Sequence, residues 1–259
     1  MSDEGVLRRL GVVGEGEAVR AILGAAERAG LDAVEGGARA MAEERGVDAI
    51  VAVGESALLS LARHGVSAAV LPVGPVAGVG AVPRSAAERG VGSLVDGAFE
   101  AVEHPVLAAA AAPGEVRALF DLTLVTEEPA RISEYTVRSE TATVDQFRAD
   151  GVVVATPAGS SDYARAAGGP VIDAGTGVVG VVPISPFATD TDHWVLADDS
   201  VVLRVERDEA PVELLADGQP TGRVTPGEDI RVRPVDVVRL LTVPEGRSPF
   251  EERSVPIER

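Results

Sequence analysis

Residues 150 to 170 read Asp150-Gly-Val-Val-Val-Ala-Thr-Pro-Ala-Gly-Ser-Ser-Asp-Tyr-Ala-Arg-Ala-Ala-Gly-Gly-Pro170. The apolar run predicts a buried strand, which enters a Gly/Ser-rich turn and then a short helix closed by Gly168-Gly169. Such a turn presents backbone N–H groups and hydroxyls to anions and to sugar hydroxyls. From the pattern alone, a plain strand–turn–helix without a ligand remains the alternative.

Upstream of this segment, the first hundred residues alternate apolar strands with amphipathic helices. Strands are expected over residues 7–13, 48–53 and 68–73, and helices over 17–30, 38–45 and 57–64. Residues 74–92 are rich in Gly, Pro and Ala and are expected to form loop, followed by a helix over 93–103. This alternation predicts an α/β fold that begins with a parallel, doubly wound, Rossmann-like lobe.

From about Val106 the pattern changes to strand-like runs separated by short turns, which predicts a β-rich second lobe. The expected strands cover 119–125, 132–137, 151–156, 178–184, 201–205, 212–216, 230–234 and 237–243. The predicted organisation is an α/β lobe over 1–104, a β-rich lobe over 105–244, and a charged, proline-containing tail over 245–259 that is expected to be poorly ordered.

The composition is strongly acidic, with a formal charge of −18 and 23 basic residues that are all arginine. Such a surface repels phosphate backbones and anionic membranes, so we expect neither nucleic acid nor a membrane as partner. A mean hydropathy of +0.17 argues against disorder. The charge instead predicts a halophilic protein, because a Debye length of about 3 Å at 1 M salt screens the repulsion.

Cysteine is absent, which excludes disulfides, thiolate nucleophiles and cysteine-based metal sites. The three histidines are far apart and show no metal-ligand spacing, so no metal-ligating residue is predicted. The N-terminus lacks the pattern of a signal peptide, and no apolar run reaches the roughly 20 residues that span a bilayer. We therefore expect a cytoplasmic protein.

Residues 150–170 resemble the NAD kinase signature, which runs roughly Asp-Gly-x-x-x-x-Thr-Pro-Thr-Gly-Ser-Thr-Ala-Tyr-x-x-Ser-Ala-Gly-Gly-Pro. The order of neighbouring motifs is also similar: 145–149 matches the lead-in to the signature, 181–186 the following strand, and Asp217-Gly-Gln219 a late turn. The similarity covers about 48–243 and is strong over 145–219. The chain is thus identified as a divergent, haloarchaeal-type member of the NAD kinase family, with a degenerate catalytic motif.

The resemblance implies an NAD kinase-like fold, in which an α/β nucleotide-binding lobe precedes a β-rich, sandwich-like lobe that binds the dinucleotide. It implies phosphoryl transfer from ATP to the 2′-hydroxyl on the adenosine side of NAD, with Mg²⁺ or another divalent cation. It also implies a homo-oligomer, a dimer or a tetramer. The implied substrate contacts are Asp121, Asp150, Thr156, Gly159, Ser160, Ser161 and Tyr163.

The catalytic motif departs from the family pattern, because Val53-Gly-Glu-Ser-Ala57 stands where the family has Gly-Gly-Asp-Gly-Thr. Glu55 is the only carboxylate there and is the candidate base, while Gly54 and Ser56 are the candidate phosphate contacts. The alternative is that Glu55 is only a solvated acid at a helix N-terminus. A glutamate extends further than an aspartate, and a misplacement of about 1 Å can cost on the order of a hundredfold in rate.

Further departures lie in the substrate contacts, where Phe120-Asp121 replaces Asn-Glu and Asp162 replaces Ala. Phe187 stands where the family often has His. Three hypotheses follow: an active but divergent NAD kinase, a kinase for another nucleotide-like alcohol, and a non-catalytic nucleotide-binding paralogue of NAD kinase.

Overall fold

The computed structural model describes residues 7–111, 114–128, 131–188, 190–198 and 201–247. The chain forms two compact units, one of residues 1–103 with 238–259 and one of residues 104–237. We call them unit 1 and unit 2. The boundary expected at residue 104 lies beside this division, but the chain after Val237 returns to unit 1. Most of the tail expected to be poorly ordered, residues 248–259, lies outside the described part of the chain.

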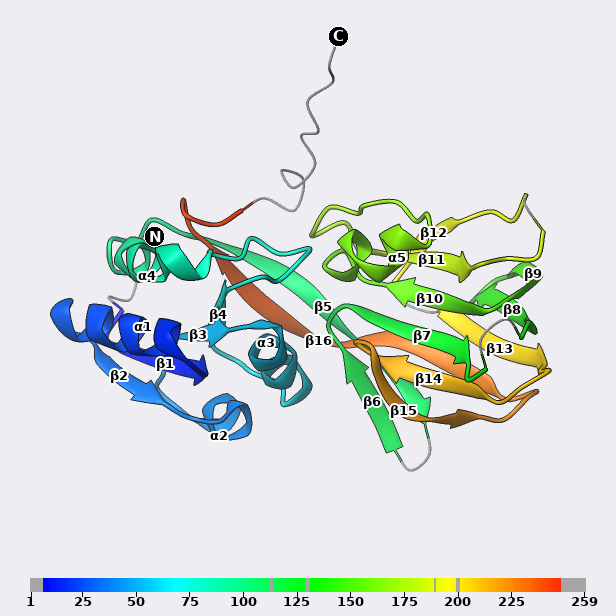
Figure 1. The fold of residues 1–259 in the computed structure, drawn as a ribbon, viewed down its shortest axis with the longest axis horizontal. Helices are drawn as coiled ribbons and strands as arrows, with labels where there is room; N and C mark the ends of the chain where they lie inside the picture. Colours follow the sequence, from blue (N-terminus) through cyan, green and yellow to red (C-terminus); the bar gives the residue numbers. More distant parts are fainter. Residues whose placement is uncertain (1–6, 112–113, 129–130, 189, 199–200, 248–259) are drawn as a thin grey trace, which may run out of the picture. The chain divides into compact units, whose positions relative to one another are not determined.

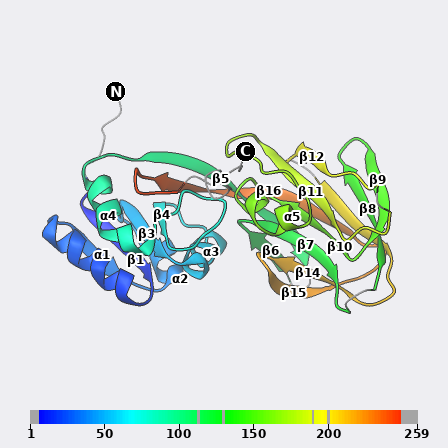
Figure 2. The ribbon, with the colours of Figure 1, turned by 45° about the horizontal axis from the view of Figure 1, so that its top comes forward.

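Unit 1 is built on a parallel sheet with the strand order β2-β1-β3-β4 (Figures 1 and 2). The strands are β1 (Arg9–Gly14), β2 (Asp32–Glu35), β3 (Ala49–Val53) and β4 (Ala69–Val73). The helices are α1 (Glu17–Arg28), α2 (Ala38–Glu43), α3 (Glu55–Arg63) and α4 (Ala87–Val95), with a 3₁₀ turn over Arg84–Ala86. The predicted doubly wound lobe is confirmed.

The apolar pattern of the sequence explains the packing of unit 1. All five residues of β3 are buried, as expected for a strand inside a parallel sheet. On α1 the buried residues Val19, Ile22 and Ala26 follow the predicted 3.6-residue period. These side chains meet those of β1 and α4 in one hydrophobic core.

Two expectations for this unit are wrong. Of the helix expected over 93–103 only residues 93–95 are helical, because α4 starts earlier, at Ala87, and ends before Gly97 (φ 71°), and a strand begins at Glu100. The buried face of α4, which includes Val91 and Leu94, lies partly in the stretch expected to be loop. The four-residue strand β2 was not expected; none of its residues is buried, and it is defined by its parallel pairing with β1.

Unit 2 contains a six-stranded antiparallel sheet with the order β12-β11-β10-β7-β14-β15. Its strands are β7 (Asp121–Thr126), β10 (Gly151–Ala155), β11 (Val178–Ile184), β12 (Trp194–Ala197), β14 (Val212–Ala216) and β15 (Gln219–Val224). A 3₁₀ turn, η2 (Gly159–Ser161), and the short helix α5 (Tyr163–Ala166) follow β10.

The second layer of unit 2 pairs β9 (Thr143–Ala149) with β8 (Ser133–Ser139), β8 with β13 (Val201–Arg207), and β13 with β16 (Asp229–Thr242). A hairpin joins β5 (Glu100–Ala111) to β6 (Gly114–Ala118). The sequence pattern breaks β16 into two strands around Pro234, but the structure forms a single strand there. The strands β5, β6, β9, β12 and β15 were not expected.

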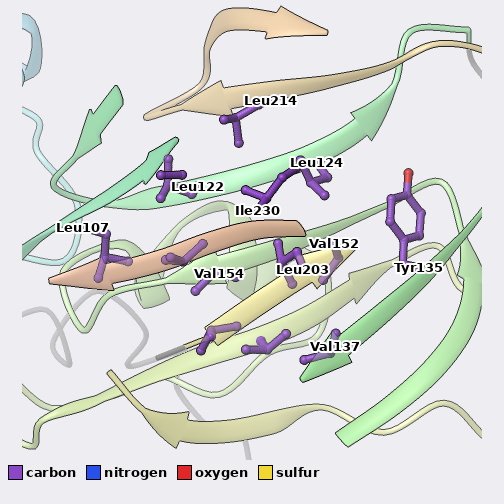
Figure 3. Close-up of a cluster of buried hydrophobic side chains, with 14 of the residues drawn as sticks. Leu107, Leu122, Leu124, Tyr135, Val137, Val152, Val154, Leu203, Leu214 and Ile230 are labelled. Atoms are coloured by element: carbon purple, nitrogen blue, oxygen red, sulfur yellow. The ribbon is translucent and has the colours of Figure 1, made fainter. Parts of the chain in front are cut away.

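One hydrophobic core joins the two layers of unit 2 (Figure 3). Leu122 and Leu124 of β7 and Val152 and Val154 of β10 contribute from the first sheet, and Leu203 of β13 from the second. These side chains are at most 1% exposed. Side chains from the facing layers thus pack into one core and form the predicted β-rich, sandwich-like unit, in which β10 is buried along its whole length.

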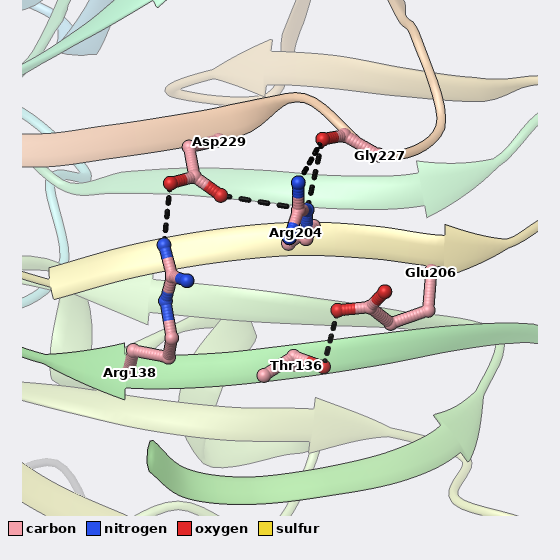
Figure 4. A network of polar contacts seen from close by, with 6 residues as sticks. All are labelled: Thr136, Arg138, Arg204, Glu206, Gly227 and Asp229. Carbon is pink, nitrogen blue, oxygen red and sulfur yellow. Dashed lines mark hydrogen bonds and ion pairs between the residues drawn. The ribbon is translucent and has the colours of Figure 1, made fainter. Parts of the chain in front are cut away.

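A polar network ties β8, β13 and β16 together beside this core (Figure 4). Asp229 forms an ion pair with Arg138 and another with Arg204 (3.5 Å), and Arg204 Nε donates to the Gly227 carbonyl (2.8 Å). Thr136 donates to Glu206 at 2.8 Å. In the part of the chain that the structure describes, no helix is long and apolar enough to cross a membrane.

Candidate functional site

A cleft of about 1070 Å³ opens in unit 1 at the carboxyl ends of β1, β2 and β3. Ligands bind at this edge of a parallel sheet in doubly wound folds. Gly14 ends β1 with φ 135°, and a Cβ on it would lie 2.6 Å from the Val53 carbonyl oxygen. A glycine is therefore required where β1 leaves the sheet against β3.

The predicted catalytic residues gather in this cleft, because Gly54, Glu55 and Ser56 all line it. Glu55 is the first residue of α3, and its side chain is exposed, as is that of Ser56. Gly54 has φ 94°, a conformation that favours glycine. Val53 is 5% exposed and belongs to the hydrophobic core as well as to the cleft wall.

In unit 2, the turn after β10 is held by its own hydroxyls. Thr156 Oγ1 donates to the Leu119 carbonyl at 2.7 Å and accepts the Gly159 N–H at 3.2 Å. Ser160 Oγ donates to the Pro157 carbonyl at 2.7 Å and accepts the Ile172 N–H at 2.9 Å. Both side chains are buried. Of the predicted ligand contacts, Thr156 and Ser160 are thus engaged in bracing the turn.

Gly159 packs directly on Phe120, in the connection between β6 and β7. A Cβ at this position would lie 2.1 Å from the Phe120 carbonyl oxygen, which also accepts the Thr156 N–H at 2.9 Å. The glycine therefore lets the turn approach Phe120 and Asp121. This contact brings the two predicted parts of the substrate site together.

Asp121 lies buried at the start of β7, and its carboxylate accepts a hydrogen bond from Thr123 Oγ1 at 2.9 Å. Burial raises the pKa of Asp121 to about 6, the Thr123 hydrogen bond opposes this shift, and the negative charges of Asp217 and Asp162 add to it. Asp217 accepts the Phe120 N–H at 2.7 Å, and its own N–H donates to the Asp121 carbonyl at 2.9 Å.

Tyr163 stands at the start of α5 with 42% of its surface exposed. Desolvation raises the pKa of the Tyr163 phenol, and the charges of Asp121 and Asp150 raise it further. The structure thus places Tyr163 in the field of both predicted substrate-binding carboxylates. Ser161 Oγ is buried and has no hydrogen-bond partner among the described residues.

The arrangement offers carboxylate acceptors for hydroxyl and amide donors, an exposed aromatic ring, and a buried hydroxyl without a partner. Asp162 and Asp217, which act on Asp121, were not among the predicted site residues, although the sequence comparison had marked the Asp217 turn. Arg84 lines the cleft of unit 1 and was also not predicted. Its only sequence signal is a single cation after a Gly/Pro/Ala-rich stretch.

A family model described as "ATP-NAD kinase C-terminal domain" matches residues 120–237. The chain is 34% identical over 121 residues to an NAD kinase of Methanosarcina mazei, a match that covers 46% of this chain. It spans about two fifths of the length of the Methanosarcina relatives. It is 30% identical over 206 residues to an NAD kinase of Thermomicrobium roseum, covering 76% of this chain and 71% of the relative.

The fold is similar to the crystal structure of an NAD kinase from Archaeoglobus fulgidus in complex with ATP. The TM-score is 0.71, the sequence identity is 23%, and the match covers 91% of this chain and 92% of the other. The resemblance thus extends over both units.

Proposed function

Because the chain belongs to the NAD kinase family, we propose that it transfers a phosphoryl group from ATP to the 2′-hydroxyl of the adenosine ribose of NAD, giving NADP. The observation that supports this best is the braced turn of unit 2. It packs on Phe120, which precedes Asp121, and the charge of Asp121 acts on the Tyr163 phenol; these residues lie inside the region that the family model matches.

Glu55 would act as the base of this reaction. The ribose 2′-oxygen attacks the terminal phosphorus of ATP, the bond from that phosphorus to the bridging oxygen breaks, and ADP leaves with the bridging oxygen. The proton of the 2′-hydroxyl passes to the Glu55 carboxylate. The position of Glu55 at the rim of the cleft, beside Gly54 and Ser56, supports this role and the phosphate contacts proposed for those two residues.

Asp121 and Asp150 would accept hydrogen bonds from the hydroxyl and amide donors of NAD, and the Tyr163 ring would pack against one of its planar groups. The buried Ser161 hydroxyl would complete its hydrogen bonding with the ligand, since it lacks a partner among the described residues. Thr156, Gly159 and Ser160 would act indirectly, because they hold the turn that positions these groups.

The residues of the cleft suit a divalent cation that is bound mainly through phosphates. No group of three or more His, Asp or Glu side chains among the described residues is placed to hold a metal ion. Mg²⁺ in phosphoryl-transfer sites needs only one or two carboxylates besides substrate phosphates, and Glu15, Glu35 and Glu55 line the cleft. When bound, the cation would neutralise charge on the phosphates.

The test is NADP formation from ATP and NAD in concentrated salt, with Glu55→Gln as the main variant. Loss of a general base lowers kcat by on the order of a hundredfold to ten-thousandfold, which is the expected result. Glu17→Gln is the matched control, because Glu17 is an exposed acid at the first position of α1, as Glu55 is of α3, and does not line the cleft. Full activity of Glu55→Gln would show that Glu55 is not the base.

A second candidate is a non-catalytic, nucleotide-binding member of the family. Its support is the altered turn, where Val53 is buried in the core and Gly54 is the only glycine between β3 and Ser56. Calorimetry with NAD, NADP and ATP separates the two candidates. Tight binding without turnover by the wild-type chain would favour the second.

We also propose a halophilic, cytoplasmic homo-oligomer, a dimer or a tetramer, from the acidic composition and the family membership. The proposed small-molecule partners are NAD and ATP. Light scattering across a salt series measures the oligomeric state and the salt requirement together. A monomer at every salt concentration would contradict the proposed oligomer.

A further inference from the structure

A second cavity of unit 1, of about 390 Å³, lies beside the cleft and shares Pro75 and Arg84 with it. The connection between β4 and α4 forms most of its wall, from glycine, proline and small aliphatic residues. Among the described residues that line it, the charged side chains are Arg84 and Arg247. Both charged residues that the described lining contains are thus cations, in a chain with 41 acidic and 23 basic residues.

The neighbouring cleft has the opposite character. Glu15, Glu35 and Glu55 line it, and Arg84 is its only basic lining residue within the described chain. Arg84 therefore stands at the boundary between an acidic and a basic compartment. An anion that enters from the cleft is repelled by the three carboxylates and attracted toward the wall formed by Arg84.

The backbone leaves the Arg84 guanidinium exposed to this space. A Cβ on Gly74 would lie 3.4 Å from Arg84 Nε, and a Cβ on Gly54 would lie 3.6 Å from Nη2. Both glycines have positive φ, 117° and 94°, so the two strand ends present only backbone to the guanidinium. The side chains of Arg84 and Arg247 form no ion pair or hydrogen bond with other described residues.

Arg247 is held at the cavity through its backbone, whose N–H donates to the Ala81 carbonyl at 3.1 Å. Its side chain is exposed, as is that of Arg84. Ser85 adds a hydroxyl to the same lining. Two guanidinium groups supply planar forks of N–H donors, whose geometry matches the oxygens of a phosphate.

We propose that the Arg84–Arg247 cavity binds a phosphate group. Its volume equals that of about a dozen water molecules at roughly 30 Å³ each, which leaves room for the anion and part of its hydration shell. The proline and valine side chains in the wall lower the polarity around the cavity, which strengthens the attraction of an anion to the guanidinium groups. The inference rests on the proposed function only for the source of the phosphate, either the ATP chain or the 2′-phosphate of NADP.

The test is calorimetry on the full chain with inorganic pyrophosphate, ATP, NAD and NADP, at two salt concentrations. Arg84→Gln and Arg247→Gln are each expected to weaken pyrophosphate binding by about tenfold or more, as for the loss of one charge-assisted hydrogen bond. Arg89→Gln is the control, because Arg89 is an exposed arginine of α4 that lines neither space. It is expected to change the affinity by less than about twofold.

The nucleotides identify the source. A parallel loss for ATP and pyrophosphate assigns the cavity to the donor, whereas a loss of the preference for NADP over NAD assigns it to the 2′-phosphate. Phosphate ligands that bind the wild type and both arginine variants equally, or that do not bind the wild type, overturn the inference. Arginine-dependent pyrophosphate binding without NADP formation would refute the kinase and leave this site standing.

Discussion

Asp121→Asn is expected to stabilise the protein at pH 8 and to leave its stability unchanged at pH 3. The substitution keeps the shape of the side chain and an oxygen that can accept the Thr123 hydrogen bond. It removes a buried negative charge that lies near Asp162 and Asp217. The pKa of Asp121 is raised from 3.8 to about 6, and each pKa unit corresponds to 1.36 kcal/mol, so the ionised carboxylate costs about 3 kcal/mol of folding free energy.

The direction in which stability changes with pH follows from proton binding by the folded and unfolded chain. Folded Asp121 keeps its proton to a higher pH than the unfolded chain, so its contribution to stability is complete below pH 3.8 and is lost as the pH rises through 6. His104 has the opposite effect, because burial lowers its pKa from 6.5 to about 4. The unfolded chain takes up the His104 proton first, so stability is lost as the pH falls from 6.5 to 4, again by about 3 kcal/mol.

The two contributions nearly cancel in the wild type between pH 4 and 6.5. Urea unfolding at a fixed salt concentration, with the fluorescence of Trp194 as probe, measures the free energy of unfolding of the wild type and the variants at each pH. The Asp121→Asn profile should rise with pH relative to the wild type, the His104→Leu profile should fall, and the double variant should return to the wild-type slope. Glu140→Gln, at an exposed position, is the control. An Asp121→Asn profile parallel to that of the wild type would refute the assignment of a raised pKa to Asp121.

Three substitutions in unit 2, with Gly92→Ala in α4 of unit 1 as a comparison, test the packing of unit 2 by thermal or urea unfolding. Gly159→Ala should lower the free energy of unfolding by about 1–3 kcal/mol, because the new Cβ would meet the Phe120 carbonyl. Gly92→Ala should raise it by about 0.5–1 kcal/mol, because this helical position has no atom within 4 Å of an added Cβ. Equal effects of the two substitutions would contradict the close contact at Gly159. Leu124→Ala should cost about 2–5 kcal/mol, since Leu124 is fully buried in the core, and a loss below about 1 kcal/mol would contradict that packing. Thr156→Val keeps the side-chain shape but removes two hydrogen bonds of the turn. It should lower the free energy of unfolding by about 1–3 kcal/mol and weaken NAD binding. An unchanged NAD affinity would argue against the bracing role of Thr156.

Periodicity located most of the long elements of this chain, but it missed the twelve-residue strand β5 and several short or polar strands. The strand Val178–Ile184 and the strand Val212–Ala216 have the predicted bounds, because a run of apolar residues there is bounded by turn residues. The strands β2 and β15 contain no buried residue, so no apolar run marks them, and they are defined by pairing with a neighbour. Pro234 suggested a break in β16 that the pairing with β13 and β4 overrides.

The sequence by itself determined the family, the order of the two lobes and the residues of the signature turn, because a collinear run of glycines, hydroxyls and an aspartate is a local property. Only the tertiary structure decided what those residues touch. It engages Thr156 and Ser160 in bracing the turn, brings Gly159 against Phe120, and buries Asp121 near two other carboxylates. Burial and charge proximity depend on residues far apart in the chain, so the raised pKa of Asp121 and the arginine-lined cavity had no counterpart in the sequence pattern.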